Sequence, residues 1–209
     1  MTEFTETVLA KPFFTPVVMH RWEDSEELNR QLKEAVLAQE RQSTGTIRSN
    51  VGGWQSNQDF MTWTGDAGKL LGRRIIELAN HATTMLLKHF NATASFSWKV
   101  SIWANVNRRG HWNKMHYHPG STWSGTYYVD AGEAPPSDPP GAGRISFMDP
   151  VLAGQMTFFS GLVSQYFEVD PVAGLMVLFP SYLPHFVQPY MGQRPRISIA
   201  FNVHKEPYP

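Results

Sequence analysis

Hydrophobic spacing predicts two amphipathic helices in the first half of the chain. Leu28, Leu32 and Val36 recur every four residues, so they lie along one face of a helix that we expect over about 24–42. A second helix is predicted to begin near Asp66, because a second apolar stripe has spacings of three and four residues. Its members are Leu71, Ile75, Leu78, Ala82 and Met85. Each helix therefore has one face to bury.

From about residue 95 onward the pattern changes to short runs rich in β-branched and aromatic residues, which predict strands. The predicted strands cover 96–106, 125–129, 145–147, 175–179 and 196–203, and 13–19 is also strand-like. Glycine and proline mark 134–143 as a loop, and 154–170 is a looser stretch. Loops of this length often gate a site.

Helices followed by many short strands predict a mainly β fold, a jelly roll with the N-terminal helices packed on one sheet. A length of 209 residues favours one domain, 1–209, with a helical part over about 20–92 and a β core over about 95–204. The glycine-rich stretch 49–56 reads as a loop, either a tight structural turn or a segment that contacts substrate.

The amino-acid composition limits which metal ligands, catalytic groups and partners the chain can have. The chain has no cysteine, which excludes disulfides, thiolate metal sites and cysteine nucleophiles, so a bound metal must use histidine and oxygen ligands. Basic and acidic residues both total 18, which argues against nucleic-acid binding. The first residues lack the basic start and apolar core of a secretory signal, and no apolar run is long enough to span a membrane. A cytoplasmic location is the resulting expectation.

His116 and His118 are the informative histidines. Alternate residues on a strand project to the same side, so both rings can meet one ion, and Pro119-Gly120 ends the strand at a sheet rim. Two solvent-facing histidines on an exposed strand would also explain the spacing. The pair alone does not decide between a metal site and a surface.

His185 is the third candidate, near the start of a strand that resumes after a proline turn. A core histidine bonded to the backbone would explain it equally well. Arg196, eleven residues later, opens the last strand, and a hairpin would place it beside His185 and point a fixed cation at the same cavity. A guanidinium grips a carboxylate through paired hydrogen bonds, so a metal beside it suits an oxo-acid.

These segments, taken in order, resemble the iron(II)/2-oxoglutarate oxygenase superfamily, which has a double-stranded β-helix fold. The resemblance rests on His116-x-His118, Ser124-Gly125-Thr126-Tyr127-Tyr128-Val129, Gly174-Leu175-Met176-Val177-Leu178-Phe179-Pro180, His185 and Arg196-x-Ser198. More narrowly, Ser49-Asn50-x-Gly52-Gly53-Trp54-x-Ser56 and Asn113-x-x-His116-x-His118-Pro119-Gly120-Ser121 resemble a bacterial family of such oxygenases. The resemblance spans about 13–204.

The resemblance implies an enzyme with iron(II) and 2-oxoglutarate as cofactors. It makes His116 and His185 iron ligands, Arg196 the anchor of the far carboxylate of 2-oxoglutarate, and Ser198 its companion. His118 is the departure, because most of the superfamily has aspartate or glutamate at that position. The implied reaction is hydroxylation of a substrate C–H bond with release of succinate and carbon dioxide.

Three polar residues are expected beside the iron, where they would bind the cosubstrate or orient a ligand. They are Asn105, Asn113 and Tyr128, of which Tyr128 could equally be a core aromatic. Arg194 competes with Arg196 for the carboxylate, but it precedes Pro195 and is expected in the turn.

Other functions stay open at this point. If His118 turned outward, the vacant position could hold chloride and the enzyme could halogenate. A three-histidine cupin dioxygenase without a cosubstrate, or a non-catalytic jelly roll with a structural metal, would use the same histidines. We expect molecular oxygen and a small-molecule or peptide substrate as partners, and the N-terminal helices leave room for a homodimer.

Overall fold

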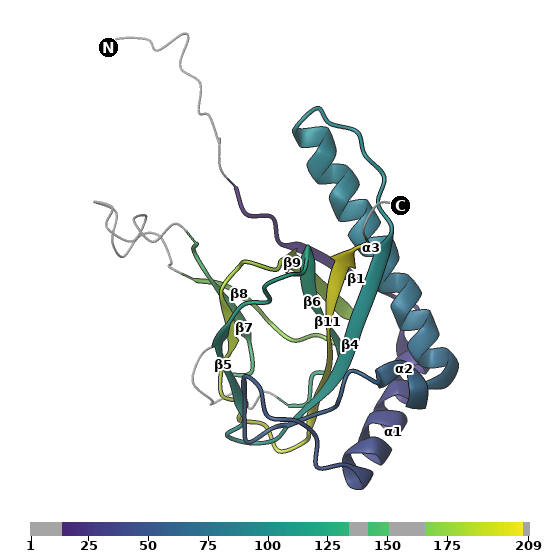
Figure 1. Cartoon of the computed structure of the whole chain (residues 1–209). Coiled ribbons are helices and arrows are strands. Elements are labelled where there is room, and N and C mark those ends of the chain that lie inside the picture. Colours follow the sequence, from purple (N-terminus) through teal and green to yellow (C-terminus); the bar gives the residue numbers. More distant parts are fainter. Residues whose placement is uncertain (1–13, 134–141, 151–165, 207–209) are drawn as a thin grey trace, which may run out of the picture.

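The computed structural model of the chain describes residues 14–133, 142–150 and 166–206 (Figure 1). In this part the helices are α1 (Glu26–Gln42), α2 (Phe60–Trp63) and α3 (Gly65–His89). The strands are β1 (Val18–Arg21), β2 (Asn50–Val51), β3 (Trp54–Gln55), β4 (Trp98–Asn107), β5 (Trp112–His116), β6 (Trp123–Asp130), β7 (Ile145–Met148), β8 (Tyr166–Val169), β9 (Leu175–Pro180), β10 (His185–Val187) and β11 (Arg196–Lys205).

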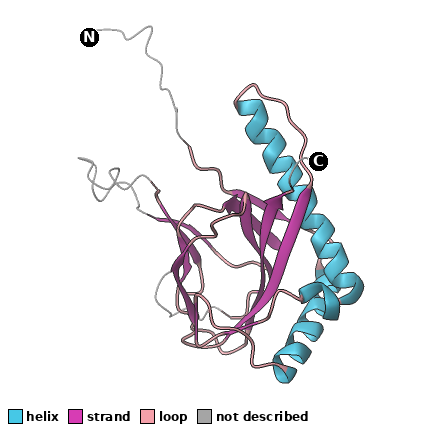
Figure 2. Ribbon diagram, viewed as in Figure 1, coloured by secondary structure: helices cyan, strands magenta, loops and turns pink. Residues whose placement is uncertain are grey.

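The described strands form two antiparallel sheets that face each other (Figure 2). The larger sheet has the order β1-β9-β6-β11-β4-β3, and the smaller has the order β2-β5-β10-β7-β8. Strands that follow one another in sequence often lie in different sheets, as β9 and β10 do. This arrangement is a double-stranded β-helix, with a space between the sheets into which side chains of both can point.

Alternation along β11 explains why the large sheet has two different faces. Ile197, Ile199, Phe201 and Val203 are fully buried and belong to the apolar core shared with the helices. Their neighbours, Arg196, Ser198, Ala200 and Asn202, line the space between the sheets. Because successive side chains of a strand point to opposite faces, one strand supplies both the core and the cavity wall.

The helices cover the outer face of the large sheet, as Figure 1 shows. Their apolar stripes supply Leu28, Leu32, Val36, Leu71, Ile75 and Leu78 to the core. Polar contacts fix them in place as well. The Tyr127 hydroxyl donates to Oδ1 of Asn29 on α1 at 2.6 Å, and the Trp123 indole donates to Oγ1 of Thr83 on α3 at 3.0 Å.

The turn between β2 and β3 carries the chain from one sheet to the other. β2 pairs with β5 in the small sheet, whereas β3 pairs with β4 in the large one. Gly52, in the turn, has φ of +78°, and a Cβ there would lie 2.6 Å from the ring of His111. Only glycine fits this position without strain.

The predicted mainly β fold with helices on one sheet is confirmed, and the five strands predicted after residue 95 are present. The sequence missed α2, a single turn, and the very short β2 and β3, which lie inside the predicted loop 49–56. It also missed β8, whose first three residues are exposed and leave no alternating pattern. The predicted loop residues 134–141 and 154–165 lie outside the described residues, as do residues 1–13.

None of the described helices combines the length and the apolar character that crossing a membrane requires.

Candidate metal centre

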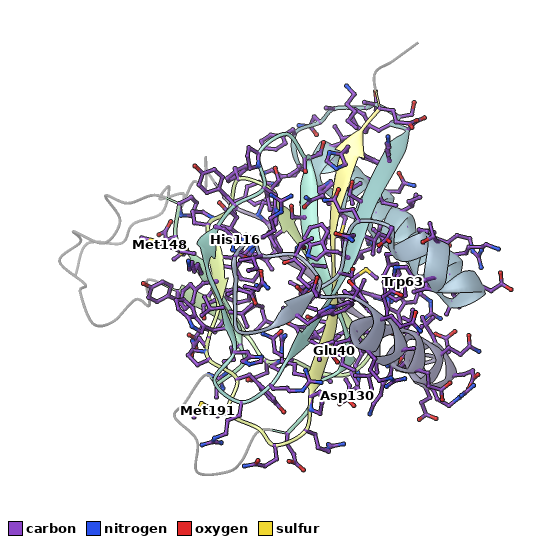
Figure 3. The ribbon with its side chains drawn as sticks, turned by 60° about the horizontal axis from the view of Figure 1, so that its bottom comes forward. Glu40, Trp63, His116, Asp130, Met148 and Met191 are labelled. Atoms are coloured by element: carbon purple, nitrogen blue, oxygen red, sulfur yellow. The ribbon has the colours of Figure 1, made fainter. Side chains whose placement is uncertain are left out.

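A cavity of about 720 Å³ lies between the two sheets. Its inner end is lined by buried side chains such as Arg196, Tyr128 and Phe179, and its outer end by exposed ones such as Arg48 and Tyr117. His116, labelled in Figure 3, is on the small-sheet side of this cavity. Cavities of this size hold cofactors and drug-sized ligands.

Three histidines gather on the small-sheet wall. One ring nitrogen from each of His116, His118 and His185 lies within 4.8 Å of the others. The ring centroids are 4.3 Å apart for His116 and His185, 5.0 Å for His116 and His118, and 5.2 Å for His118 and His185. Among the described residues, this is the group that could hold a metal ion.

Strand pairing brings His116 and His185 together, because they are directly opposite each other on β5 and β10. The next pair is Val187 with Asn113, so β5 has an extra residue between the two pairs. Such a bulge re-aims side chains. It lets Asn113 and His116, three residues apart, both line the cavity.

His118 reaches the cluster in a different way from the one predicted. β5 ends at His116, so His118 is not on the same strand but in the segment that follows. Its backbone N–H donates to the carbonyl of Ser181 at 2.9 Å, which holds this segment against the turn before His185. The predicted convergence of the two rings is therefore present without the predicted strand alternation.

Backbone carbonyls fix the tautomer of two of the rings. Nδ1 of His116 lies 2.7 Å from the carbonyl oxygen of Lys114, and Nδ1 of His185 lies 2.9 Å from that of Leu183. A carbonyl can only accept, so each Nδ1 carries the proton and each Nε2 keeps its lone pair. Imidazoles that bind metals are held by this kind of bond. The Ser49 hydroxyl lies 3.5 Å from Nε2 of His116.

All three imidazoles are neutral at physiological pH. Burial lowers the pKa of His116, and burial together with the nearby His116 lowers the pKa of His118 to about 4. Burial, with a further contribution from His116, lowers the pKa of His185 well below its ordinary value. Neutral imidazole is the form that binds a metal, so protons do not compete for these ligands near neutral pH.

Arg196 occupies the inner end of the cavity without an acidic partner. The residue is 2% exposed, its Nε has no hydrogen-bond partner, and no ion pair joins it to any described acid. Its Nη1 lies 3.3 Å from the Ser198 hydroxyl, and its guanidinium carbon lies 5.1 Å from the centroid of the Tyr128 ring. The hydroxyl of Tyr128 is fully buried and has no hydrogen bond of ordinary geometry to a described residue, although it is close enough to Arg196 to influence its charge. Burial lowers the pKa of Arg196 and raises that of Tyr128.

A row of polar side chains crosses the large sheet beside this arginine. Strand register pairs Gln55 with Asn105, Asn105 with Ser198, and Ser198 with Tyr128. All four line the cavity. Asn113 is elsewhere, on the small sheet, where its amide donates to the Ser49 hydroxyl at 3.2 Å.

The predicted hairpin that joins His185 to Arg196 is wrong. β10 pairs with β5 and β7, whereas β11 pairs with β4 and β6, so the two residues come from different sheets. They still line the same cavity, from its two walls. Arg194, the competing arginine, is exposed and lies 3.4 Å from Glu133 on the outer turn.

Sequence reasoning missed several residues of the cavity wall. Thr126 and Asn202 line it because they alternate with Tyr128 on β6 and with Ser198 on β11. Extending the period of two along each strand from the predicted residue would have found both. Arg48 and Lys114 were also missed, although Arg48 adjoins the motif that begins at Ser49 and Lys114 lies inside the motif that begins at Asn113.

Comparisons with known proteins come from sequence and from structure. Residues 101–202 match the model of a family described as "Putative 2OG-Fe(II) oxygenase". This range contains the three histidines, Arg196 and Ser198. No curated protein matches the chain in sequence.

Solved structures share the fold at low identity. A prolyl-4-hydroxylase from Pseudomonas putida has a TM-score of 0.64 at 16% identity, covering 91% of this chain and 93% of its own. A prolyl hydroxylase from Trichoplax adhaerens, in complex with a peptide of hypoxia-inducible factor, has a TM-score of 0.63 at 12% identity, covering 90% and 83%. HygX from Streptomyces hygroscopicus, with nickel and 2-oxoglutarate bound, has a TM-score of 0.57 at 9% identity, covering 91% and 83%.

Proposed function

We propose a hydroxylation for this chain, which is a member of the iron(II)- and 2-oxoglutarate-dependent oxygenases. It is therefore an oxidoreductase, with iron(II) and 2-oxoglutarate as its cofactors. The reaction that we propose converts a C–H bond of a small molecule or peptide side chain into an alcohol. Oxygen and 2-oxoglutarate are consumed, and succinate and carbon dioxide are released.

One observation carries the proposal: three neutral imidazoles and one buried, unpaired guanidinium line the same cavity. A buried charge without a counter-ion is costly, so the site is built for a ligand that brings a carboxylate. A donor set of nitrogen atoms alone suits a transition metal better than calcium or magnesium. A metal and a carboxylate site together fit 2-oxoglutarate, which has a chelating keto acid at one end and a second carboxylate at the other.

The residues would divide the work as follows. His116, His118 and His185 would hold iron(II), with the lone pair of Nε2 available on His116 and His185. Arg196 would bind the far carboxylate of 2-oxoglutarate, helped by the hydroxyls of Ser198 and Tyr128. The bound pair supplies oxidation by O₂, with one oxygen atom entering the alcohol and the other entering succinate.

The neighbouring polar residues would position these groups. Asn113 holds the Ser49 hydroxyl beside His116, and this hydroxyl would turn away from Nε2 of His116 if that nitrogen held the metal. Asn105 lies between Gln55 and Ser198 in the polar row and would orient the cosubstrate. Apolar side chains such as Phe179, whose ring centroid is 4.6 Å from that of His185, would exclude water from the inner end.

A test of this proposal measures the products of 2-oxoglutarate in the presence of iron(II) and oxygen. We expect succinate and carbon dioxide in equal amounts, at a rate that rises when the right molecule from a panel of metabolites and peptides is added. Mass spectrometry of that molecule should show one added oxygen atom, derived from O₂. A molecule that stimulates succinate production but gains no oxygen atom would contradict hydroxylation. A molecule that is oxidised without consumption of 2-oxoglutarate would instead indicate a dioxygenase of the three-histidine type.

A further inference from the structure

Two cations line the outer end of the cavity, where no role has been given to them. Arg48 precedes β2 and Lys114 lies on β5, and both side chains are exposed. The two strands pair, and the Lys114 N–H donates to the carbonyl of Ser49 at 2.9 Å. Arg48, two residues before β2, and Lys114, on β5, are therefore on neighbouring segments at one rim of the cavity.

Neither cation is neutralised by an acid within the described ranges 14–133, 142–150 and 166–206. No described acidic residue forms an ion pair with Arg48 or Lys114, although other surface cations such as Arg30, Lys69 and Arg144 do have such partners. Among the residues that line the cavity in the described ranges, there is no aspartate or glutamate at all. The chain as a whole has no net charge, so this positive lining is local.

The proposed cofactors do not remove this excess of positive charge. Iron(II) and the doubly ionised 2-oxoglutarate cancel each other, and the imidazoles are neutral. With a carboxylate in place of His118, the common choice in the superfamily, the metal site would bring one negative charge of its own. Here it brings none, so the loaded cavity would keep the charges of Arg196, Arg48 and Lys114. A substrate with a negative group would be favoured in such a cavity.

The two cations are also close to the reacting end of the site along the backbone. The carbonyl oxygen of Lys114 accepts the Nδ1–H of His116, and Ser49, next to Arg48, has its hydroxyl 3.5 Å from Nε2 of the same ring. Uncharged hydrogen-bonding residues, Asn57 and Gln58, line the cavity as well. A ligand whose acid group bound at this rim would therefore extend its remainder toward the three histidines.

We propose that Arg48 and Lys114 bind the acid group of the substrate, and that the substrate is a small organic anion with a carboxylate or a phosphate. This inference rests on the proposed function, because it assigns the second half of a cavity whose inner half would hold 2-oxoglutarate. Arg48 can grip either group through paired hydrogen bonds, and Lys114 adds a point charge.

Binding of simple probes to the protein loaded with Ni(II) and 2-oxoglutarate, measured by calorimetry, tests the proposal without turnover. The probes are phenylacetate with its uncharged match phenylacetamide, and phenyl phosphate with its uncharged match phenol. The aromatic ring suits Trp103 and Tyr117 in the cavity wall. We expect at least one anion to bind about tenfold or more tightly than its uncharged match. The anion that binds more tightly indicates whether the acid group of the substrate is a carboxylate or a phosphate.

Charge removal at the rim should abolish this preference. In the double variant Arg48→Gln/Lys114→Gln, the anion is expected to bind about tenfold more weakly, near the affinity of its uncharged match. The matched control is Arg41→Gln/Lys88→Gln, which removes two exposed cations that do not line the cavity, and its affinity for the anion should equal that of the wild type. Added potassium chloride should weaken anion binding in the wild type and the control but not in the rim variant.

The two proposals fail in different ways. Equal binding of anions and their uncharged matches, no binding of either anion, or an unchanged affinity in the rim variant would overturn the assignment of Arg48 and Lys114. Binding of Ni(II) and 2-oxoglutarate should be the same in the wild type and in the rim variant. Absence of 2-oxoglutarate binding in the wild type would contradict the proposed function, whatever the probes do.

Discussion

Arg196 lies under the ring of Tyr128, with 5.1 Å between the guanidinium carbon and the ring centroid, and both side chains are buried. The ring face attracts the cation but does not neutralise it. Nε of Arg196 and the hydroxyl of Tyr128 have no hydrogen bond of ordinary geometry to any described residue, although the two groups are close enough to affect each other's pKa. In the protein without ligands, this pair therefore opposes folding and is suited to binding a carboxylate.

Replacing Arg196 should weaken 2-oxoglutarate binding without lowering the stability of the folded protein. Arg196→Met removes a buried charge and keeps most of the side-chain volume, so we expect the thermal midpoint of the metal-free protein to stay the same or rise. The same variant should bind 2-oxoglutarate at least about 100-fold more weakly, because the charged hydrogen bonds to the far carboxylate are lost. Differential scanning fluorimetry with and without Ni(II) and 2-oxoglutarate measures both. A variant that is strongly destabilised yet still stabilised by 2-oxoglutarate would contradict the assigned role.

The three histidines should contribute unequally to metal binding. Carbonyl oxygens hold the rings of His116 and His185, whereas His118 has no side-chain hydrogen bond in the described structure. We expect His116→Ala and His185→Ala to abolish iron binding, and His118→Ala to weaken it by about 10- to 100-fold. Metal content after dialysis against defined iron(II) concentrations shows how much each substitution weakens iron binding. An equal loss at all three positions would show that the backbone contacts do not matter.

The lowered pKa values predict how the metal-free protein responds to pH. His118 has a pKa of about 4 when folded, and an ordinary value of about 6.5 is expected when unfolded. Between these values the unfolded chain binds more protons, so the free energy of unfolding rises with pH and levels off above about 6.5. His118→Gln removes one such group, so its stability should fall less than that of the wild type between pH 7 and pH 5. Urea unfolding at several pH values gives the free energy of unfolding of both proteins. If this free energy changed with pH by the same amount in both, the lowered pKa of His118 would be contradicted.

The turn that joins the two sheets should depend on Gly52. Gly52→Ala places a Cβ at positive φ and 2.6 Å from the ring of His111, which accepts a hydrogen bond from the Arg108 N–H. Gly110 is the matched control, because its φ is +83° and a Cβ added there would meet no atom within 4 Å. Chemical denaturation should show a loss of about 1–2 kcal/mol for Gly110→Ala and a larger loss for Gly52→Ala. Equal losses would show that the contact with His111 is not limiting.

The sequence predicted which faces of the strands are apolar better than it predicted which strands are neighbours. The alternation in β11 separates Ile197 and Ile199 from Arg196 and Ser198 without any structure, because it depends only on the geometry of one strand. Pairing depends on contacts between distant segments, and a jelly roll sends successive strands to opposite sheets. For this reason the predicted hairpin of His185 with Arg196 was wrong although both side chains line one cavity.

Local irregularities account for the remainder of what the sequence did not predict at the site. The bulge in β5, which turns Asn113 and His116 to the same side, breaks the period of two. The cations at the rim, Arg48 and Lys114, were hidden by a net charge of zero, because composition averages over the whole surface. Their significance depends on the absence of acids among the described residues that line one cavity, which only the three-dimensional arrangement reveals.

The central claim is that three imidazoles and Arg196 together hold iron(II) and 2-oxoglutarate in one cavity. The most direct measurement is the visible charge-transfer absorption that a keto acid gives when it chelates iron(II), recorded without oxygen. We predict the band for the wild type, its absence in His185→Ala, and its appearance in Arg196→Met only at much higher 2-oxoglutarate concentrations. A wild type that binds iron(II) but gives no band at saturating 2-oxoglutarate would contradict the claim.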